Sequence, residues 1–89
     1  MPTRTVAIGS SVGLHARPAS LFTQAVAATG LDVTIAKAGQ PPMDASSILM
    51  VMALGVGHGE EVTLEAEGDG ADEALDGLVD LLARDLDAE

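Results

Sequence analysis

The sequence predicts one α+β domain in which a four-stranded antiparallel sheet carries three helices on one face. Three observations support this class. Segments of alternating polarity and segments of helical periodicity follow one another in the order β-α-β-β-α-β-α. Each alternating segment has only one apolar face, which is typical of an antiparallel sheet covered on one side. The 89 residues are 47% hydrophobic, which suits a single compact domain over residues 1–89.

The first strand is predicted for residues 3–8 and the first helix for residues 16–28. Pro18 suits the first turn of this helix, because its missing N–H costs nothing there. Gly30 is a natural stop behind the last turn. The apolar stripe of the helix consists of Ala19, Phe22 and Val26.

Residues 31–37 alternate again and predict a second strand. A tight turn should lead from it into a short strand around Met43, and the two prolines before that residue suit a sheet edge. Ser46 or Ser47 can then cap a short helix that ends near Leu54.

Residues 61–67 show the clearest alternation and predict the last strand. We expect Asp69 to cap a final helix that runs from Ala71 to about Leu86. The inner face of the strand comprises Val62, Leu64 and Ala66, and the stripe of the helix comprises Ala74, Leu75, Leu78, Val79 and Leu82.

Composition excludes several classes of function. The net charge is −10, from 14 acids against 4 bases, so neither nucleic acid nor an anionic membrane surface is an expected partner. The chain contains no cysteine, which excludes disulfides and thiolate metal sites. Its longest apolar run, residues 48–54, is too short to span a bilayer. We expect a soluble, cytoplasmic monomer without membrane insertion.

The segment Gly-Leu-His-Ala-Arg-Pro-Ala-Ser, residues 13–20, carries the candidate chemistry. His15 directly precedes the first predicted helix, where the backbone N–H groups of Ala16 and Arg17 lack helical partners and the helix dipole favours an anion. The positive helix end should keep one ring nitrogen of His15 neutral and nucleophilic. The guanidinium of Arg17 matches phosphate oxygens. The alternative is a surface histidine in a turn beside an ordinary exposed arginine.

This segment could carry a phosphoryl group, but nothing beside it suggests a stand-alone enzyme. The sequence has no P-loop, no acidic cluster typical of magnesium sites and no nucleotide-binding motif. We therefore expect a carrier without cofactor or metal. A second histidine, His58, lies in Gly-Val-Gly-His-Gly and has no ligands at zinc spacing, so it is interpreted as a loop histidine.

Five segments are informative when taken together: residues 13–19 (GLHARPA), 33–35 (VTI), 47–49 (SIL), 51–55 (VMALG) and 59–62 (GEEV). They resemble the HPr family, the histidine-containing phosphocarriers of the bacterial phosphoenolpyruvate:sugar phosphotransferase system. The resemblance covers nearly the whole chain and implies an open-faced β-sandwich. It also implies that Enzyme I phosphorylates the Nδ1 atom of His15, that Arg17 stabilises the phosphoryl group, and that a IIA domain of a sugar permease receives it.

The second predicted helix is apolar all round. If Val51 and Leu54 face the core, then Ile48, Leu49 and Met52 remain on the outer side; the alternative is that a compact fold buries them all. The resemblance implies that partners dock across the first two helices. The docking surface would then comprise Ile48, Leu49 and Met52 together with Arg17, Leu21 and Gln24, which share one flank of the first helix.

Two further expectations concern regulation and partner affinity. Ser47 matches a position that a regulatory kinase phosphorylates in one branch of the family; the alternative, which the frequency of serine caps favours, is a simple helix cap. A regulatory binding module acting through Ser47 is thus a rival to the carrier. Gln24 and Ala27 stand where family members often carry bases, so steering toward acidic partners should be poor.

Overall fold

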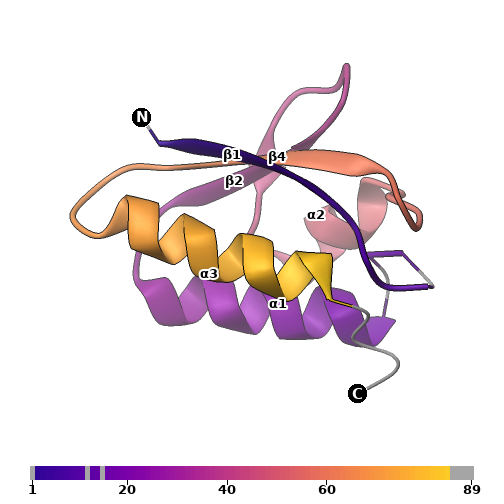
Figure 1. Ribbon diagram of the computed structural model, residues 1–89, viewed down its shortest axis with the longest axis horizontal. Helices are drawn as coiled ribbons and strands as arrows, with labels where there is room; N and C mark the ends of the chain where they lie inside the picture. Colours follow the sequence, from indigo (N-terminus) through magenta and orange to yellow (C-terminus); the bar gives the residue numbers. More distant parts are fainter. Residues whose placement is uncertain (1, 12, 15, 85–89) are drawn as a thin grey trace.

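A computed structural model describes residues 2–11, 13–14 and 16–84 of the chain. Its four strands form one antiparallel sheet in the order β1-β4-β2-β3, which confirms the predicted class (Figure 1). The elements in chain order are β1 (Thr3–Ala7), α1 (Ala16–Thr29), β2 (Val33–Lys37), β3 (Met43–Asp44), α2 (Ile48–Ala53), β4 (Glu61–Ala66) and α3 (Ala71–Ala83).

The helices α1 and α3 run in opposite directions beneath one face of the sheet, and α2 lies near one end (Figure 1). The end of β1, the start of α1, α2 and the end of α3 meet at that end of the molecule. The connections from α1 to β2 and from β4 to α3 lie at the opposite end. The fold therefore separates two poles, and the predicted site belongs to the first.

Alternation along the strands places one apolar row of side chains on the face of the sheet that the helices cover. Val6 pairs with Val62 and Ile35 pairs with Leu64 across the sheet, and all four are buried. The predicted stripe of α1 lies opposite them, because Ala19, Phe22 and Val26 are buried as well. From α3, the core receives Ala71, Leu75, Leu78 and Leu82.

The final helix begins at Ala71 as predicted but differs from its prediction in its cap and in its last residue. Its N-cap is Gly70, with a φ of 81° and no side-chain cap hydrogen bond, so Asp69 is not the cap. The helix ends at Ala83 rather than near Leu86, which lies outside the described residues. The reason is a tight final turn, in which the Arg84 N–H donates to the Leu81 carbonyl at 3.3 Å.

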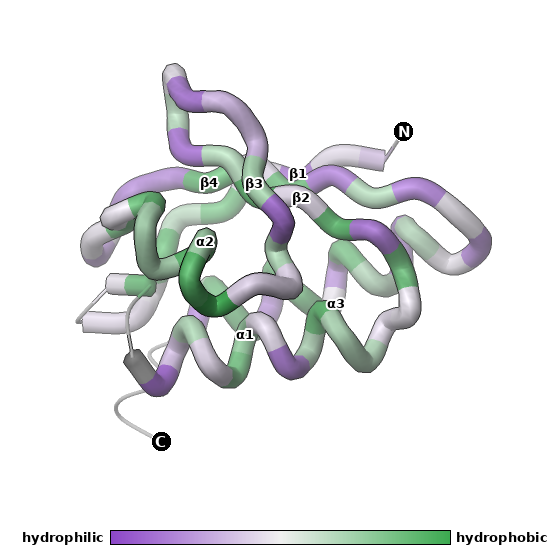
Figure 2. Tube along the Cα trace, turned by 180° about the vertical axis from the view of Figure 1, so that it is seen from behind, coloured by the Kyte–Doolittle hydropathy of each residue, from purple (hydrophilic) through white to green (hydrophobic). Residues whose placement is uncertain are grey.

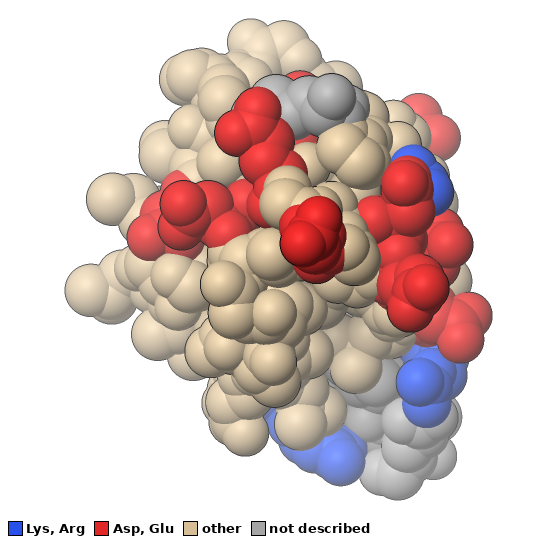
Figure 3. All heavy atoms as spheres, turned by 90° about the vertical axis from the view of Figure 1, so that its left-hand side faces the viewer, with Lys and Arg blue, Asp and Glu red and all other residues tan. Residues whose placement is uncertain are grey.

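Acidic side chains gather on the face formed by the β4–α3 connection, at the pole opposite the predicted site (Figure 3). Arg4 of β1 spans to α3 nearby and contacts the carboxylates of Asp72 and Asp76, each at 3.0 Å. The hydrogen bonds that this guanidinium donates to Asp76 and then to Asp72 raise its pKa above the ordinary value. Among the described residues, no helix is long and apolar enough to cross a membrane.

Candidate functional site

The predicted phosphoryl acceptor, His15, lies outside the described residues. Its neighbours on both sides are placed. Leu14 is buried, and α1 begins at Ala16, as the sequence predicts. Arg17 is exposed in the first turn, and Pro18 behind it is fully buried. The segment that leads into position 15 is therefore held by the core, and the first turn of α1 presents Arg17 to solvent.

Backbone hydrogen bonds fasten the segment between β1 and α1, residues 8–14, to two other parts of the chain. Ile8 and the segment 59–60 exchange two bonds: the Ile8 N–H donates to the Glu60 carbonyl at 3.0 Å, and the Gly59 N–H donates to the Ile8 carbonyl at 2.9 Å. The Gly9 N–H donates to the Leu82 carbonyl of α3 at 2.9 Å. These bonds fix where the segment leaves the sheet.

A second group of bonds fixes the far end of the same segment. The Leu14 N–H donates to the Val56 carbonyl at 2.9 Å. Gly13 adopts a φ of 74°, and a Cβ there would overlap the Val56 carbonyl oxygen and lie 2.8 Å from the Gly57 Cα. Glycine is needed at position 13 both for the left-handed backbone and for this close approach.

The loop that supports this segment, residues 55–60, is itself braced. The Gly57 N–H donates to Glu60 Oε1 at 2.7 Å, and Lys37 Nζ lies 3.3 Å from Glu60 Oε2. The bond from Gly57, and then Lys37, lower the pKa of the Glu60 carboxyl. Lys37 Nζ also donates to the Gly55 carbonyl at 3.2 Å. A lysine at the end of β2 thus ties the support loop to the sheet.

His58 belongs to this arrangement, although the sequence indicated only a loop histidine. Its Nδ1 lies 3.1 Å from the carbonyl oxygen of Ser10, a buried residue. The Gly13 N–H donates to the same carbonyl at 3.0 Å. The only signal in the sequence was a histidine among glycines, and no local rule connects it to a partner 48 positions earlier.

The helix α2 exposes apolar side chains beside this pole, which overturns the alternative of complete burial. Val51 and Leu54 are buried as expected, whereas Ile48 is 40% and Leu49 is 79% exposed. Met50 is 45% exposed and was not predicted, while Met52 is half-buried against the core. In Figure 2, α2 is coloured as strongly hydrophobic. We call Ile48, Leu49 and Met50 the apolar patch.

The predicted flank of α1 is placed as its spacing requires. Arg17 and Gln24 are exposed, and Leu21 between them is half-buried. Gln24 Nε2 donates to Ser20 Oγ at 3.0 Å. Neither α1 nor α2 contains an acidic residue, and the two helices pack against each other. The flank and the apolar patch therefore form a surface on two adjacent helices whose one charge is Arg17.

Ser47 is the N-cap of α2, as one of the two sequence interpretations expected. Its Oγ accepts a hydrogen bond from the Met50 N–H at 3.4 Å. Ser46, the alternative cap, instead donates from its hydroxyl and its backbone N–H to Asp44 Oδ1 at 2.7 and 2.9 Å. The hydroxyl bond and then the backbone bond lower the pKa of Asp44.

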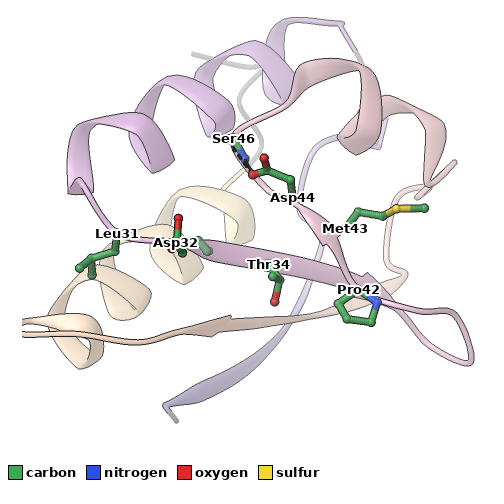
Figure 4. Close-up of a pocket in the computed structure, with 8 residues that line it drawn as sticks. Leu31, Asp32, Thr34, Pro42, Met43, Asp44 and Ser46 are labelled. Carbon is green, nitrogen blue, oxygen red and sulfur yellow. Dashed lines mark hydrogen bonds between the residues drawn. The ribbon is translucent and has the colours of Figure 1, made fainter.

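A shallow pocket of about 310 Å³ lies along β2 and β3 (Figure 4). Its wall includes Leu31, Thr34 and Pro42, with the Asp44–Ser46 bond at its rim. Among residues 2–11, 13–14 and 16–84, no group of three potential metal ligands comes together here or elsewhere.

The fold and the site define a class: small open-faced β-sandwich domains that present one helix start and an adjacent apolar helix at a single pole. Comparison with known proteins narrows this class. Residues 2–84 match the protein family described as "PTS HPr component phosphorylation site". The chain belongs to this family, the HPr phosphocarriers of the phosphotransferase system.

Individual relatives agree with this assignment. A protein named Phosphocarrier protein HPr from Streptomyces coelicolor is 48% identical over 87 residues, which cover 98% of this chain and 94% of the relative. The crystal structure of an HPr from Bacillus anthracis superposes with a TM-score of 0.85 at 36% identity, covering 91% and 95% of the two chains. A structure described as an HPr dimer from Thermoanaerobacter tengcongensis gives 0.68 at 42% identity, covering 91% and 92%.

Proposed function

We propose that the chain relays a phosphoryl group from Enzyme I to a IIA domain of a sugar permease, with His15 as the acceptor. One observation supports this most directly: the segment that leads into position 15 is held by the Leu14–Val56 bond and by the close approach at Gly13. Such anchoring restricts where the acceptor can lie, and phosphoryl transfer depends mainly on positioning and charge stabilisation.

In the proposed reaction, the Nδ1 atom of His15 forms its bond to phosphorus as the bond between phosphorus and the Enzyme I donor breaks. The product is a pros-phosphohistidine. The backbone N–H groups of Ala16 and Arg17, at the start of a helix of 14 residues, bind the phosphoryl oxygens. The exposed guanidinium of Arg17 adds a cation in the same turn. In the second transfer, the bond between phosphorus and Nδ1 breaks as phosphorus forms its bond to the acceptor of a IIA domain.

Labelling with Enzyme I and phosphoenolpyruvate tests the acceptor. The native chain should take up one acid-labile, base-stable phosphate, and His15→Ala should take up none. Arg17→Ala should still be labelled but pass the group on more slowly. Arg4→Ala is the matched control, because it removes the same charge from the opposite part of the molecule, beside Asp72 and Asp76. Equal labelling of His15→Ala would end this proposal.

The docking surface is proposed to comprise the flank of α1 and the exposed side of α2. Leu49 is its most exposed apolar side chain, so Leu49→Ala should leave the melting temperature almost unchanged. Affinity for Enzyme I should fall about fivefold or more, as for a central apolar contact. Leu31→Ala at the opposite pole is the control. An unchanged affinity for Leu49→Ala would remove α2 from the docking surface. Leu21, Gln24, Ile48 and Met52 complete the proposed contact.

We propose further that the chain acts in the cytoplasm as a monomeric carrier rather than as an enzyme. The exposed patch of three side chains is small, which suits transient contacts with larger partners. Light scattering at micromolar concentration should give the mass of one chain. A dimer would instead place this chain with the Thermoanaerobacter tengcongensis HPr dimer. Turnover of a small phosphorylated substrate by the pure chain would contradict the carrier role.

A further inference from the structure

We infer that His58 is a positioning residue, which fixes the segment leading into His15 by donating a hydrogen bond to the Ser10 carbonyl. The inference rests on the proposed function, since it concerns the geometry of the acceptor rather than its identity. It starts from one contact between two loops, in which His58 Nδ1 lies 3.1 Å from the Ser10 oxygen.

The chemistry of this contact decides which atom carries the proton. A backbone carbonyl oxygen can only accept, so the Nδ1 atom of His58 must carry a hydrogen. The neutral imidazole is therefore in its Nδ1–H tautomer. The same carbonyl accepts from the Gly13 N–H at 3.0 Å, so both of its lone pairs are used. One bond joins Gly13 to Ser10, and the other ties Ser10 to the support loop.

The surroundings show why this bond matters for the segment. Backbone bonds through Ile8 and Gly9 hold the beginning of residues 8–14, and the bond through Leu14 holds the end. The contact from His58 acts between them, at a buried residue. This side-chain bond ties the middle of the segment to residues 55–60.

The support loop can hold Ser10 in place because other contacts anchor the loop itself. Glu60 accepts from the Gly57 N–H at 2.7 Å and pairs with Lys37 at 3.3 Å. The Gly59 N–H, next to His58, donates to the Ile8 carbonyl at 2.9 Å. The backbone around His58 is thus fixed to Ile8, directly after β1, and to Lys37 at the end of β2, so the His58 side chain can hold Ser10 in a defined position.

Three variants of His58 test the position of the hydrogen-bond donor separately from the size of the side chain. In His58→Asn, the amide nitrogen lies the same number of bonds from Cα as Nδ1 does, so the donor is retained. In His58→Gln the donor is one bond further out, and in His58→Leu it is lost. We expect His58→Leu and His58→Gln to slow phosphoryl transfer from Enzyme I roughly twofold to tenfold, the factor that one net hydrogen bond represents. His58→Asn should restore the native rate.

Two further readouts distinguish positioning from general stability. Amide hydrogen exchange at Gly13 should accelerate in His58→Leu, while exchange in β4 should stay unchanged. In the native chain, long-range proton–nitrogen NMR correlation should show the Nδ1–H tautomer for neutral His58. His15→Ala is included throughout, because loss of labelling there tests the proposed function separately from His58.

The outcomes are unambiguous. A slower His58→Leu that is rescued by His58→Asn supports the positioning role. A native rate for His58→Leu overturns it, and so does equal slowing of the Leu and Asn variants. A matching loss of protection in β4 would assign the effect to overall stability and would overturn it too. If His15→Ala is labelled normally, the proposed function fails instead.

Discussion

Replacement of Gly13 by alanine should destabilise the fold through the segment that leads into His15. The left-handed φ of 74° costs a residue with a Cβ about 1 kcal/mol. The new Cβ would also overlap the Val56 carbonyl oxygen, which accepts from the Leu14 N–H. Moving that carbonyl loses a bond of about 1 kcal/mol net. Gly13→Ala should therefore lose about 2 kcal/mol or more, which lowers the melting temperature by about 8 to 16 °C.

The matched control is Gly39→Ala, in the turn between β2 and β3. Gly39 has a φ of 80°, but a Cβ there would meet nothing within 4 Å. Backbone strain alone should cost about 1 kcal/mol, or about 4 to 8 °C. Thermal unfolding followed by circular dichroism compares the two variants directly. If Gly13→Ala melts no lower than Gly39→Ala, the close approach to Val56 does not constrain this segment.

Three other outcomes follow from the same contacts. Glu60→Gln should lower the melting temperature at neutral pH, because the pKa of Glu60 is lowered in the folded state. In a pH series of melts, the difference from the native chain should be present above the unfolded pKa of about 4.3 and vanish as the pH falls through the folded pKa. Phe22→Ala removes a side chain with no exposed surface, so the free energy of unfolding measured in urea should fall by about 3 to 5 kcal/mol. A loss below about 1 kcal/mol would contradict the central place of Phe22 in the core. Arg4→Ala should lower the melting temperature slightly in dilute buffer and not at 1 M salt, because screening removes the attraction to Asp72 and Asp76; an effect independent of salt would point to packing instead.

Periodicity predicted the elements well because it reports burial directly. The inner residues of β4 and the stripe of α1 are buried as their spacing required. Helix ends were predicted less well, because they depend on hydrogen bonds that periodicity does not encode. Ser47 caps α2 with its side chain, whereas Gly70 begins α3 through its left-handed backbone and Asp69 takes no part.

The apolar helix α2 shows the limit of the same reasoning. A sequence that is apolar on every side does not state which side faces the core. The sheet and α1 decide this by burying Val51 and Leu54, so Met50 is exposed and Met52 is half-buried. The predicted set Ile48, Leu49 and Met52 therefore shares two members with the apolar patch. A helix of six residues makes a rotation of one position decisive.

The sequence by itself determined the fold class, the order of its elements, the family and the candidate acceptor, His15. Each of these depends on local spacing or on a short contiguous motif, which one chain contains in full. Only the tertiary structure decided what surrounds the segment leading into that residue. The carbonyl of Ser10 contacts His58 and the N–H of Leu14 contacts Val56 because the chain returns to the end of β1 much later in the sequence, 48 positions later in the case of His58. Such contacts depend on the packing of the whole sheet, and no local pattern specifies them.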